Sequence, residues 1–254
     1  MTSPAAKPAN SGPSPALATA RHERLFFGGM AVLLLATVFV GFAPTYYLAG
    51  LVPAPEPSRL NLPSGIVRVH AVVATLWMLL FAVQVSLVAL HRVNLHRRLG
   101  ALGFLLACAM VVTGFMAGTD TLVRNVPPGL AELLYIVNCT MVALFAIFVA
   151  FAYRMRKAPP AHKRLILMAN IAVLFAPLIR IPTPLLYLNI PAATRASYLF
   201  LLPLFLYDFW SMRKIHPATL WSSVLLVFVY ESRAAFAATA PWHNFSAWMR
   251  ALGT

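Results

Sequence analysis

The chain has 254 residues, of which 61% are hydrophobic and only 10% are charged, and its formal net charge is +14. This hydrophobic content exceeds the roughly 45–50% of a soluble domain, and together with a mean hydropathy of +0.78 it indicates an integral membrane protein. The Lys and Arg residues form short clusters between apolar segments instead of one basic domain. Their distribution argues against nucleic-acid binding and favours contact with membrane lipids.

The chain begins with a segment unlike the rest. Residues 1–20 are rich in Pro, Ala and Ser and lack the apolar core of a secretory signal, so we expect a disordered tail there. In 21–240, seven segments reach or approach the about 20 apolar residues that span a bilayer. They predict an all-α, polytopic transmembrane bundle of seven helices, since a span in lipid must satisfy its own backbone hydrogen bonds. The expected spans are 25–48, 66–90, 99–118, 130–153, 164–186, 196–212 and 218–238.

The basic residues predict the orientation of these spans. Thirteen Lys and Arg residues flank the N-terminus or follow even-numbered spans, whereas only five lie in the other connections. Because positively charged loops stay in the cytoplasm, we expect a cytoplasmic N-terminus and an external C-terminal tail at 241–254. The Pro-rich segments 53–63 and 182–191 are then external loops.

A His-x-Arg-Leu motif precedes the first, third and fifth spans, starting at His22, His96 and His162, and His216 precedes the seventh. The Arg of each motif is explained as a cytoplasmic anchor whose side chain reaches toward the headgroups. Two explanations remain for the recurrence: duplication of a two-helix hairpin, or the shared composition of membrane interfaces.

Four ionisable residues lie at a similar depth, about 5–10 Å below the expected external surface: His70, Arg180, Glu231 and Arg233. Such groups usually face the bundle interior, so they are candidate ligand-binding residues. Glu231 and Arg233 diverge by about 200° around their helix. We expect Glu231 to face inward and lie near Arg180 or His70, because its side chain is too short to reach the surface as Arg does. The alternative is an internal salt bridge that only fixes helix packing.

The second span carries a polar stripe, His70, Trp77, Gln84 and His91, spaced seven residues apart. Seven residues return to nearly the same side of a helix, so we expect the stripe to face the bundle interior. It either lines a path for protons or solute or forms hydrogen bonds with neighbouring helices.

The cytoplasmic ends of the spans carry a second polar cluster, formed by His96, Arg98, His162, Arg164, Asp208 and His216. We expect Asp208 to be a structural counter-ion for one of these basic residues. Cys108 and Cys139 lie within apolar segments and are interpreted as buried thiols. Gly114 and Gly118 form a G-x-x-x-G pattern that predicts close helix packing.

No catalytic motif is recognised: the seventh span has no Lys, and the chain contains no H-E-x-x-H, P-loop or G-x-S-x-G pattern. No metal site is predicted. Three stretches, "VHAVVATLWMLLFAVQVSLVALHRVNLHRRLGALGF", "HKRLILMANIAVLF" and "YDFWSMRKIHPATLWSS", resemble a family of uncharacterised bacterial multi-pass inner-membrane proteins with an HRRLG-type cytoplasmic loop. The resemblance implies an inner-membrane location and no established substrate.

Three functions are consistent with these patterns. The first is binding or transport of a small ligand, for which an anion is one option, from the external side. The second is a b-type haem or quinone-linked redox protein, for which His70 needs a second axial ligand and Met116 is the nearest alternative to a His. The third is a structural or assembly partner. The first requires no cofactor, and the sequence does not indicate an oligomeric state.

Overall fold

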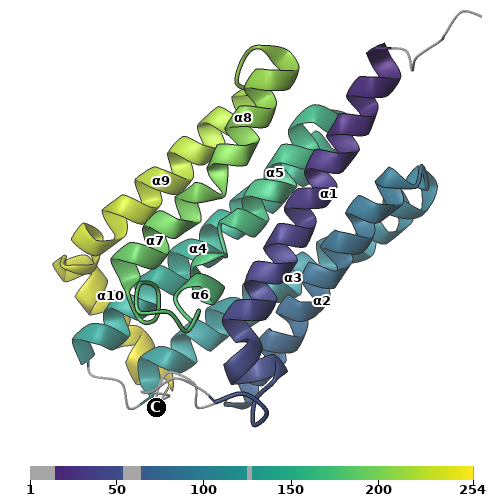
Figure 1. Ribbon diagram of the computed structural model, residues 1–254. Coiled ribbons are helices and arrows are strands. Elements are labelled where there is room, and N and C mark those ends of the chain that lie inside the picture. Colours follow the sequence, from purple (N-terminus) through teal and green to yellow (C-terminus); the bar gives the residue numbers. More distant parts are fainter. Residues whose placement is uncertain (1–14, 54–63, 125–127, 254) are drawn as a thin grey trace, which may run out of the picture.

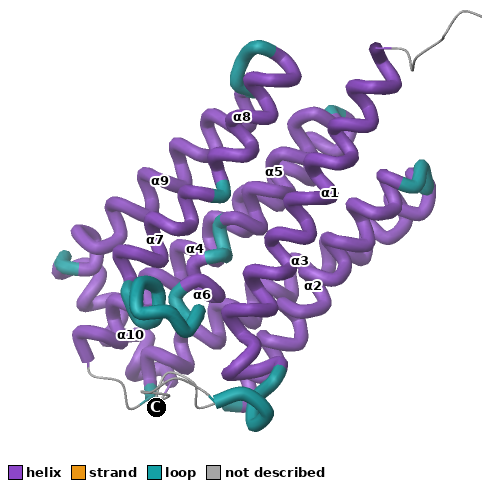
Figure 2. Tube along the Cα trace, viewed as in Figure 1, coloured by secondary structure: helices purple, strands orange, loops and turns teal. Residues whose placement is uncertain are grey.

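The computed structural model describes residues 15–53, 64–124 and 128–253, which form a helical bundle without a β-strand (Figures 1 and 2). Seven helical segments are long and apolar enough to cross a membrane, as the sequence predicted, so the chain has the architecture of a multi-pass membrane protein. The spans are Arg21–Tyr47, Gly65–Ala89, Val93–Val123, Gly129–Lys157, Pro159–Leu178, Ile190–Met212 and Pro217–Ala237.

The bundle is built from ten α-helices in the described part of the chain. They are α1 (Pro15–Phe42), α2 (Gly65–Ala89), α3 (Val93–Val123), α4 (Pro128–Arg154), α5 (Pro159–Ile171), α6 (Phe175–Leu178), α7 (Ile190–Leu199), α8 (Leu201–Met212), α9 (Pro217–Ala237) and α10 (Ala240–Gly253). A π-helical turn, η1 (Ala43–Tyr47), continues α1, and a short 3-10 turn, Met155–Lys157, follows α4.

Alternate connections lie at opposite ends of the bundle (Figure 1). One end, called the basic end, holds the start of the first span and the connections at 90–92, 155–158 and 213–216. The opposite end holds η1, the turns at 179–189 and the start of α10. The first span and each later odd-numbered span therefore run from the basic end to the opposite end.

The two chain termini differ from the sequence prediction. α1 begins at Pro15, so residues 15–20 are helical although the sequence assigned them to a disordered tail; residues 1–14 lie outside the described part. Within the expected C-terminal tail, α10 packs against α3, α4 and α9. Its Trp242 is buried and donates Nε1–H to the carbonyl of Glu132 at 3.3 Å, and this contact holds the helix on the bundle.

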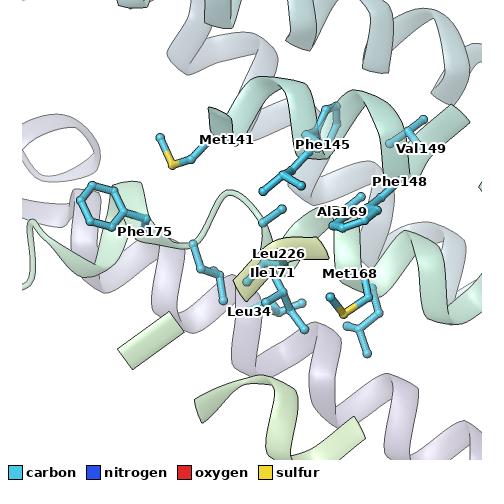
Figure 3. Packing of buried hydrophobic residues seen from close by; sticks show 14 of the residues in the cluster. Leu34, Met141, Phe145, Phe148, Val149, Met168, Ala169, Ile171, Phe175 and Leu226 are labelled. Carbon is cyan, nitrogen blue, oxygen red and sulfur yellow. The ribbon is translucent and has the colours of Figure 1, made fainter. Parts of the chain in front are cut away.

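The core lies around α4, which contacts α3, α5 and α9. Phe145 and Phe148 of α4 belong to one cluster with Leu34 of α1, Met168 of α5 and Leu226 of α9 (Figure 3), and each of these side chains is at most 1% exposed. The span formed by α5 and α6 is the most enclosed, with 67% of its apolar window buried against 17% for α2. The outer helices instead present large apolar side chains to their surroundings, as a lipid-facing surface requires.

Proline interrupts two spans. α5 ends at Ile171, and the backbone N–H groups of Val173 and Leu174 bond only three residues back, to Asn170 and Ile171. Pro177 explains the break, because proline has no N–H and its ring clashes with the carbonyl four residues before it. Pro203 acts in the same way at the junction of α7 and α8.

The fifth and sixth spans accordingly differ from their expected bounds. The fifth ends as helix at Leu178 and continues as turns over 179–189, whereas a span to 186 was expected. The sixth begins at Ile190 and has 23 residues, so it is longer than the expected 196–212. Irregular backbone at this depth is tolerated where protein buries it or where it lines a cavity.

Candidate functional site

A cavity of about 690 Å³ lies between α1, α2, α3, α4 and α6 and reaches the opposite end of the bundle. Its lining extends from Tyr47, Arg68 and Arg124 near that end to Trp77 and Phe145 near the middle of α2 and α4. Volumes of about 300–1,000 Å³ are typical of sites for small molecules. The cavity is therefore large enough for a cofactor or a drug-sized ligand.

The cavity is cationic at one end and apolar at the other. Its lining in the described chain contains three arginines, Arg68, Arg124 and Arg180, and no Asp or Glu. Toward the bundle centre it is lined by apolar side chains, among them Met78, Met110, Met141, Phe145 and Val173. A ligand that fills this space meets positive charge near the surface and hydrocarbon below it.

Arg180 is positioned by the irregular segment that follows α6. Its backbone N–H bonds to the carbonyl of Pro177 at 3.0 Å, and its Nη1 donates to the carbonyl of Ala176 at 2.7 Å. The guanidinium carbon lies 5.1 Å from the ring centre of Phe42, a cation–π contact. Among the described residues, the Ala176 carbonyl and the Phe42 ring contact the Arg180 guanidinium, and no acidic residue there forms an ion pair with it.

His70 lines the same cavity, and α3 fixes its ring. The Thr113 hydroxyl donates to the carbonyl of Ala109 at 2.7 Å and therefore accepts from His70 Nδ1 at 3.1 Å. Gly114 makes room for the imidazole, because a Cβ there would lie 3.2 Å from His70 Cε1. Nδ1 therefore carries the proton, and Nε2 keeps a lone pair that no described residue engages.

Asn138 also lies in the cavity wall, against Gly118 of the G-x-x-x-G pattern. A Cβ at Gly118 would collide with the Asn138 side chain, so the glycine permits the close approach of α3 and α4 that the sequence predicted. Within the described part of the chain, Asn138 Oδ1 is buried without a hydrogen-bond partner. An orphaned buried acceptor costs about 1–3 kcal/mol, and a ligand or water that donates to it would remove this cost.

Aromatic side chains close the inner end of the cavity. Trp77 and Phe145 meet edge to face with their ring centres 5.0 Å apart. Trp77 Nε1 donates to Asn170 Oδ1 at 3.0 Å, and Asn170 Nδ2 donates to the carbonyl of Ile166 at 2.8 Å. This chain fixes the indole in place, so the inner wall is rigid.

Irregular backbone surrounds the cavity on one side. Thr45, Tyr46 and Tyr47 of the π-helical turn line it, and so does Leu188, which has a φ of 55°. A positive φ of this size is rare for a residue with a bulky side chain. π-helical turns and strained residues cluster at functional sites. The irregular backbone and the polar groups therefore lie around the same cavity.

The last residue of the polar stripe on α2, His91, differs from the other three in its burial. Trp77 is buried, and His70 and Gln84 are half-buried. His91 is exposed beyond the end of α2, has a φ of 60°, and its Nε2 lies 2.6 Å from Arg24 Nη1. The expectation for His91 is wrong because the helix ends at Ala89, before the seven-residue repeat is complete.

The expected pairing of Glu231 is also wrong. Glu231 is exposed and accepts a hydrogen bond from the Tyr198 hydroxyl at 2.6 Å, whereas Arg233 is only 4% exposed. The Arg233 guanidinium donates to the Thr194 hydroxyl, and its carbon lies 4.4 Å from the ring centre of Tyr230. Aromatic contact compensates the buried guanidinium in a way that no buried carboxylate can use.

The four residues that were expected to form one outer site therefore lie in different places. His70 and Arg180 line the cavity, and neither Glu231 nor Arg233 does. Arg233 lies behind the cavity wall, because its guanidinium carbon is 4.7 Å from the ring centre of Phe175, which lines the cavity. Sequence reasoning missed Phe42 and Tyr47 as cavity residues and Thr113 as the residue that holds the His70 ring. For Thr113 the signal was Gly114, which allows close contact beside it.

At the basic end, Asp208 is the counter-ion of Arg164. Nε and Nη2 of Arg164 donate to Asp208 Oδ1 at 2.8 and 2.5 Å, and both side chains are at most 2% exposed. Oδ2 of Asp208 accepts from the His216 backbone N–H at 3.0 Å and from the Thr219 hydroxyl at 2.6 Å. Burial and the positive charge of Arg164 lower the pKa of His216. Its neutral Nδ1 caps α9 by accepting from Ala218 N at 3.0 Å.

The remaining members of the cytoplasmic cluster lie apart from this network. The rings of His96 and His162 are 6.3 Å apart, and His162 Nδ1 lies 2.8 Å from the carbonyl of Ala152. Arg98 is exposed and forms no ion pair in the described ranges. Five of these six residues therefore form a structural network and a separate histidine pair, and Arg98 belongs to neither.

The described ranges contain no group of three or more His, Cys, Asp or Glu residues arranged to hold a metal ion. Met116, the suggested partner of His70, is 49% exposed and does not line the cavity. Cys108 is exposed and Cys139 is half-buried, so the first is not the buried thiol that was expected.

Comparisons with protein-family models, curated proteins and solved structures find no match to this chain.

Proposed function

We propose that the protein binds a small molecule in the cavity between α1, α2, α3, α4 and α6, and that the cavity opens to the external side of a bacterial inner membrane. The carrying observation is a ligand-sized space lined by two polar groups: the Arg180 guanidinium, which has no ion-pair partner among the described residues, and Asn138 Oδ1, which is buried there without a hydrogen-bond partner. Protein interiors normally pair such groups. A bound molecule that pairs them offsets the cost of leaving them unpaired.

The external opening rests on the charge distribution. By sequence, thirteen Lys and Arg residues flank the N-terminus or follow even-numbered spans, and five belong to the alternate set, so the positive-inside rule favours a cytoplasmic basic end. Reporter fusions at residues 94, 158 and 254 test this assignment. A cytoplasmic signal from the fusion at 254 would contradict it.

A binding cavity closed at its inner end is favoured over an open channel through the protein. Phe148 and Met168 are fully buried and do not line the cavity, and each lies on the basic-end side of the cavity residue of its own span, Phe145 or Val173. The protein is therefore closed on the basic side in this conformation. Transport would require a second conformation in which these side chains separate.

The test is a cavity-filling substitution. Ala74 of α2 lines the cavity, and Ala74→Phe should remove binding of small molecules, measured by native mass spectrometry of protein purified from its membrane and by ligand-induced thermal shifts. Ala101→Phe is the matched control, because Ala101 is exposed on α3 and does not line the cavity. Equal binding by both variants and the unmodified protein would exclude the cavity as the site.

A b-type haem protein is the second candidate, and one observation favours it. His70 presents an unengaged Nε2 lone pair while Thr113 holds Nδ1, an arrangement typical of a histidine ligand supported by a neighbouring group. Met78, Met110 and Met141 line the same cavity from three helices and supply thioether groups as a second ligand. A Soret band in the purified protein that His70→Ala abolishes would support this function; a spectrum without a Soret band would count against it.

A further inference from the structure

One half-buried side chain carries the cavity charge that is neither exposed nor paired with an acid among the described residues. Of its three arginines, Arg68 is exposed and Arg124 forms an ion pair with Asp120. Arg180 is half-buried and forms no ion pair with an acid in the described chain. A desolvated cation without a counter-ion is costly within a membrane-spanning bundle. An anion bound at Arg180 would offset this cost.

The shape of the charged group restricts the anion. A guanidinium carries five N–H donors in one plane, and the carbonyl of Ala176 accepts from Nη1. Phe42 covers the guanidinium from a ring centre 5.1 Å away. A carboxylate matches the remaining in-plane donors with two parallel hydrogen bonds.

The rest of the cavity restricts the body of the ligand. Below Arg180 the lining is dominated by thioether and aromatic side chains, including Met78, Met110 and Phe145. This surface offers no charge to a small hydrated anion but accommodates a flexible apolar chain, since Met side chains adapt to irregular shapes. The polarity of the cavity follows that of a bilayer, with the charge near one surface and the apolar part toward the centre.

We propose that the ligand of this cavity is an amphipathic organic carboxylate whose head binds Arg180 and whose apolar body extends toward Trp77 and Phe145. This inference rests on the proposed binding function and specifies its ligand class. Fatty acids and aromatic acids share this chemistry, and both present one carboxylate and an apolar body.

Trp77 provides a local reporter for the test. It lines the inner end of the cavity, whereas Trp210, Trp221, Trp242 and Trp248 do not line it. The probes are 11-bromoundecanoic acid and 11-bromoundecanol, because a bromine atom quenches indole fluorescence on contact. With the full-length protein in lipid nanodiscs at about pH 8, where a carboxyl of ordinary pKa is ionised, the acid should quench Trp77 at a concentration about tenfold lower than the alcohol. Trp77→Phe should lose this quenching.

Substitutions assign the preference to Arg180. Arg180→Gln should reduce the acid-to-alcohol ratio to about one, and Arg180→Lys should retain part of it, since the charge remains but the planar fork does not. Arg195→Gln is the control, because Arg195 is exposed on α7 and does not line the cavity. If Arg180→Gln fails to fold, titration of the unmodified protein replaces it: acidification that protonates the acid should abolish its advantage and leave alcohol binding unchanged.

The outcomes separate the two proposals. Equal quenching of Trp77 by acid and alcohol would overturn the carboxylate inference and leave cavity binding standing. If neither probe quenches Trp77, the carboxylate inference fails, and the cavity-filling test decides whether the cavity binds other molecules. A preference for the acid that persists in folded Arg180→Gln, or at a pH that protonates the acid, would overturn the assignment to Arg180.

Discussion

Arg164 and Arg180 lie at opposite ends of the same span and have opposite surroundings. Arg164 donates to Asp208 and to the carbonyl of Pro160, and Asp208 in turn accepts from α9 and the segment before it. Arg180 has one carbonyl, one aromatic face and a cavity. The first arginine has a buried carboxylate as its partner, whereas the second has no acidic partner among the described residues.

We infer from this difference that the Arg164–Asp208 pair has a structural role and that Arg180 has a role in ligand binding. At the basic end, the Arg164–Asp208 pair joins α5, α8 and the start of α9, so its role is to fix the arrangement of helices. At the opposite end, the helices are interrupted and the polar groups line a space. Proteins commonly give up stability where they bind ligands. The following substitutions test whether the two ends differ in this way.

Asp208→Ala should have the largest effect. It leaves the Arg164 guanidinium buried without a counter-ion, which costs about 3–5 kcal/mol of unfolding free energy. Chemical denaturation in detergent measures the change. Glu23→Ala is the control, because Glu23 pairs with Lys163 at 2.6 Å but is 42% exposed, and exposed pairs contribute about 0–1 kcal/mol. Similar losses in both variants would show that burial of the Asp208 pair is not decisive.

Gly118→Ala should lower stability and weaken ligand binding together. The added Cβ collides with Asn138, so either this side chain rotates or α3 and α4 separate. Overpacking of this kind costs about 1–3 kcal/mol. Thermal unfolding and ligand binding are measured on the same preparation. Gly28→Ala is the control, since no atom lies within 4 Å of a Cβ at that position; a comparable loss there would refute the packing explanation.

Arg233→Gln should cost more than Glu231→Gln. Arg233 is buried against Tyr230 and Phe175, and its loss removes two cation–π contacts and a hydrogen bond to Thr194, so we expect about 1–3 kcal/mol. Glu231 is exposed, and its substitution should change the unfolding free energy by less than about 1 kcal/mol. Denaturant midpoints of the two variants measure the difference, and the reverse order would restore the inward Glu231 expected from the sequence.

Arg180→Met should have the smallest effect on the unliganded protein. Removal of a half-buried charge that has no counter-ion among the described residues should leave the melting temperature unchanged or raise the stability by about 1 kcal/mol. A ligand-induced stabilisation, in contrast, should disappear. A loss of stability as large as that of Asp208→Ala would remove the distinction between the two ends.

The sequence alone determined the features that depend on local composition. Seven apolar segments of sufficient length predicted seven spans, because the bilayer sets a minimum length whatever the packing. Asp208 was expected to be a counter-ion near the basic ends of the helices, and Arg164 is its partner. The G-x-x-x-G pattern predicted close packing, since two residues without side chains allow it in any arrangement of neighbours.

Only the tertiary structure decided which groups share a cavity. The rotation of α9 buries Arg233 and exposes Glu231, and this rotation depends on Tyr230, Thr194 and the neighbouring helices, not on the two residues themselves. The break that Pro177 makes in the fifth span was not predicted, and the folded chain places it beside η1 and α2. Helix periodicity fixes the relative directions of side chains within one element; their absolute direction follows from the packing of all seven spans.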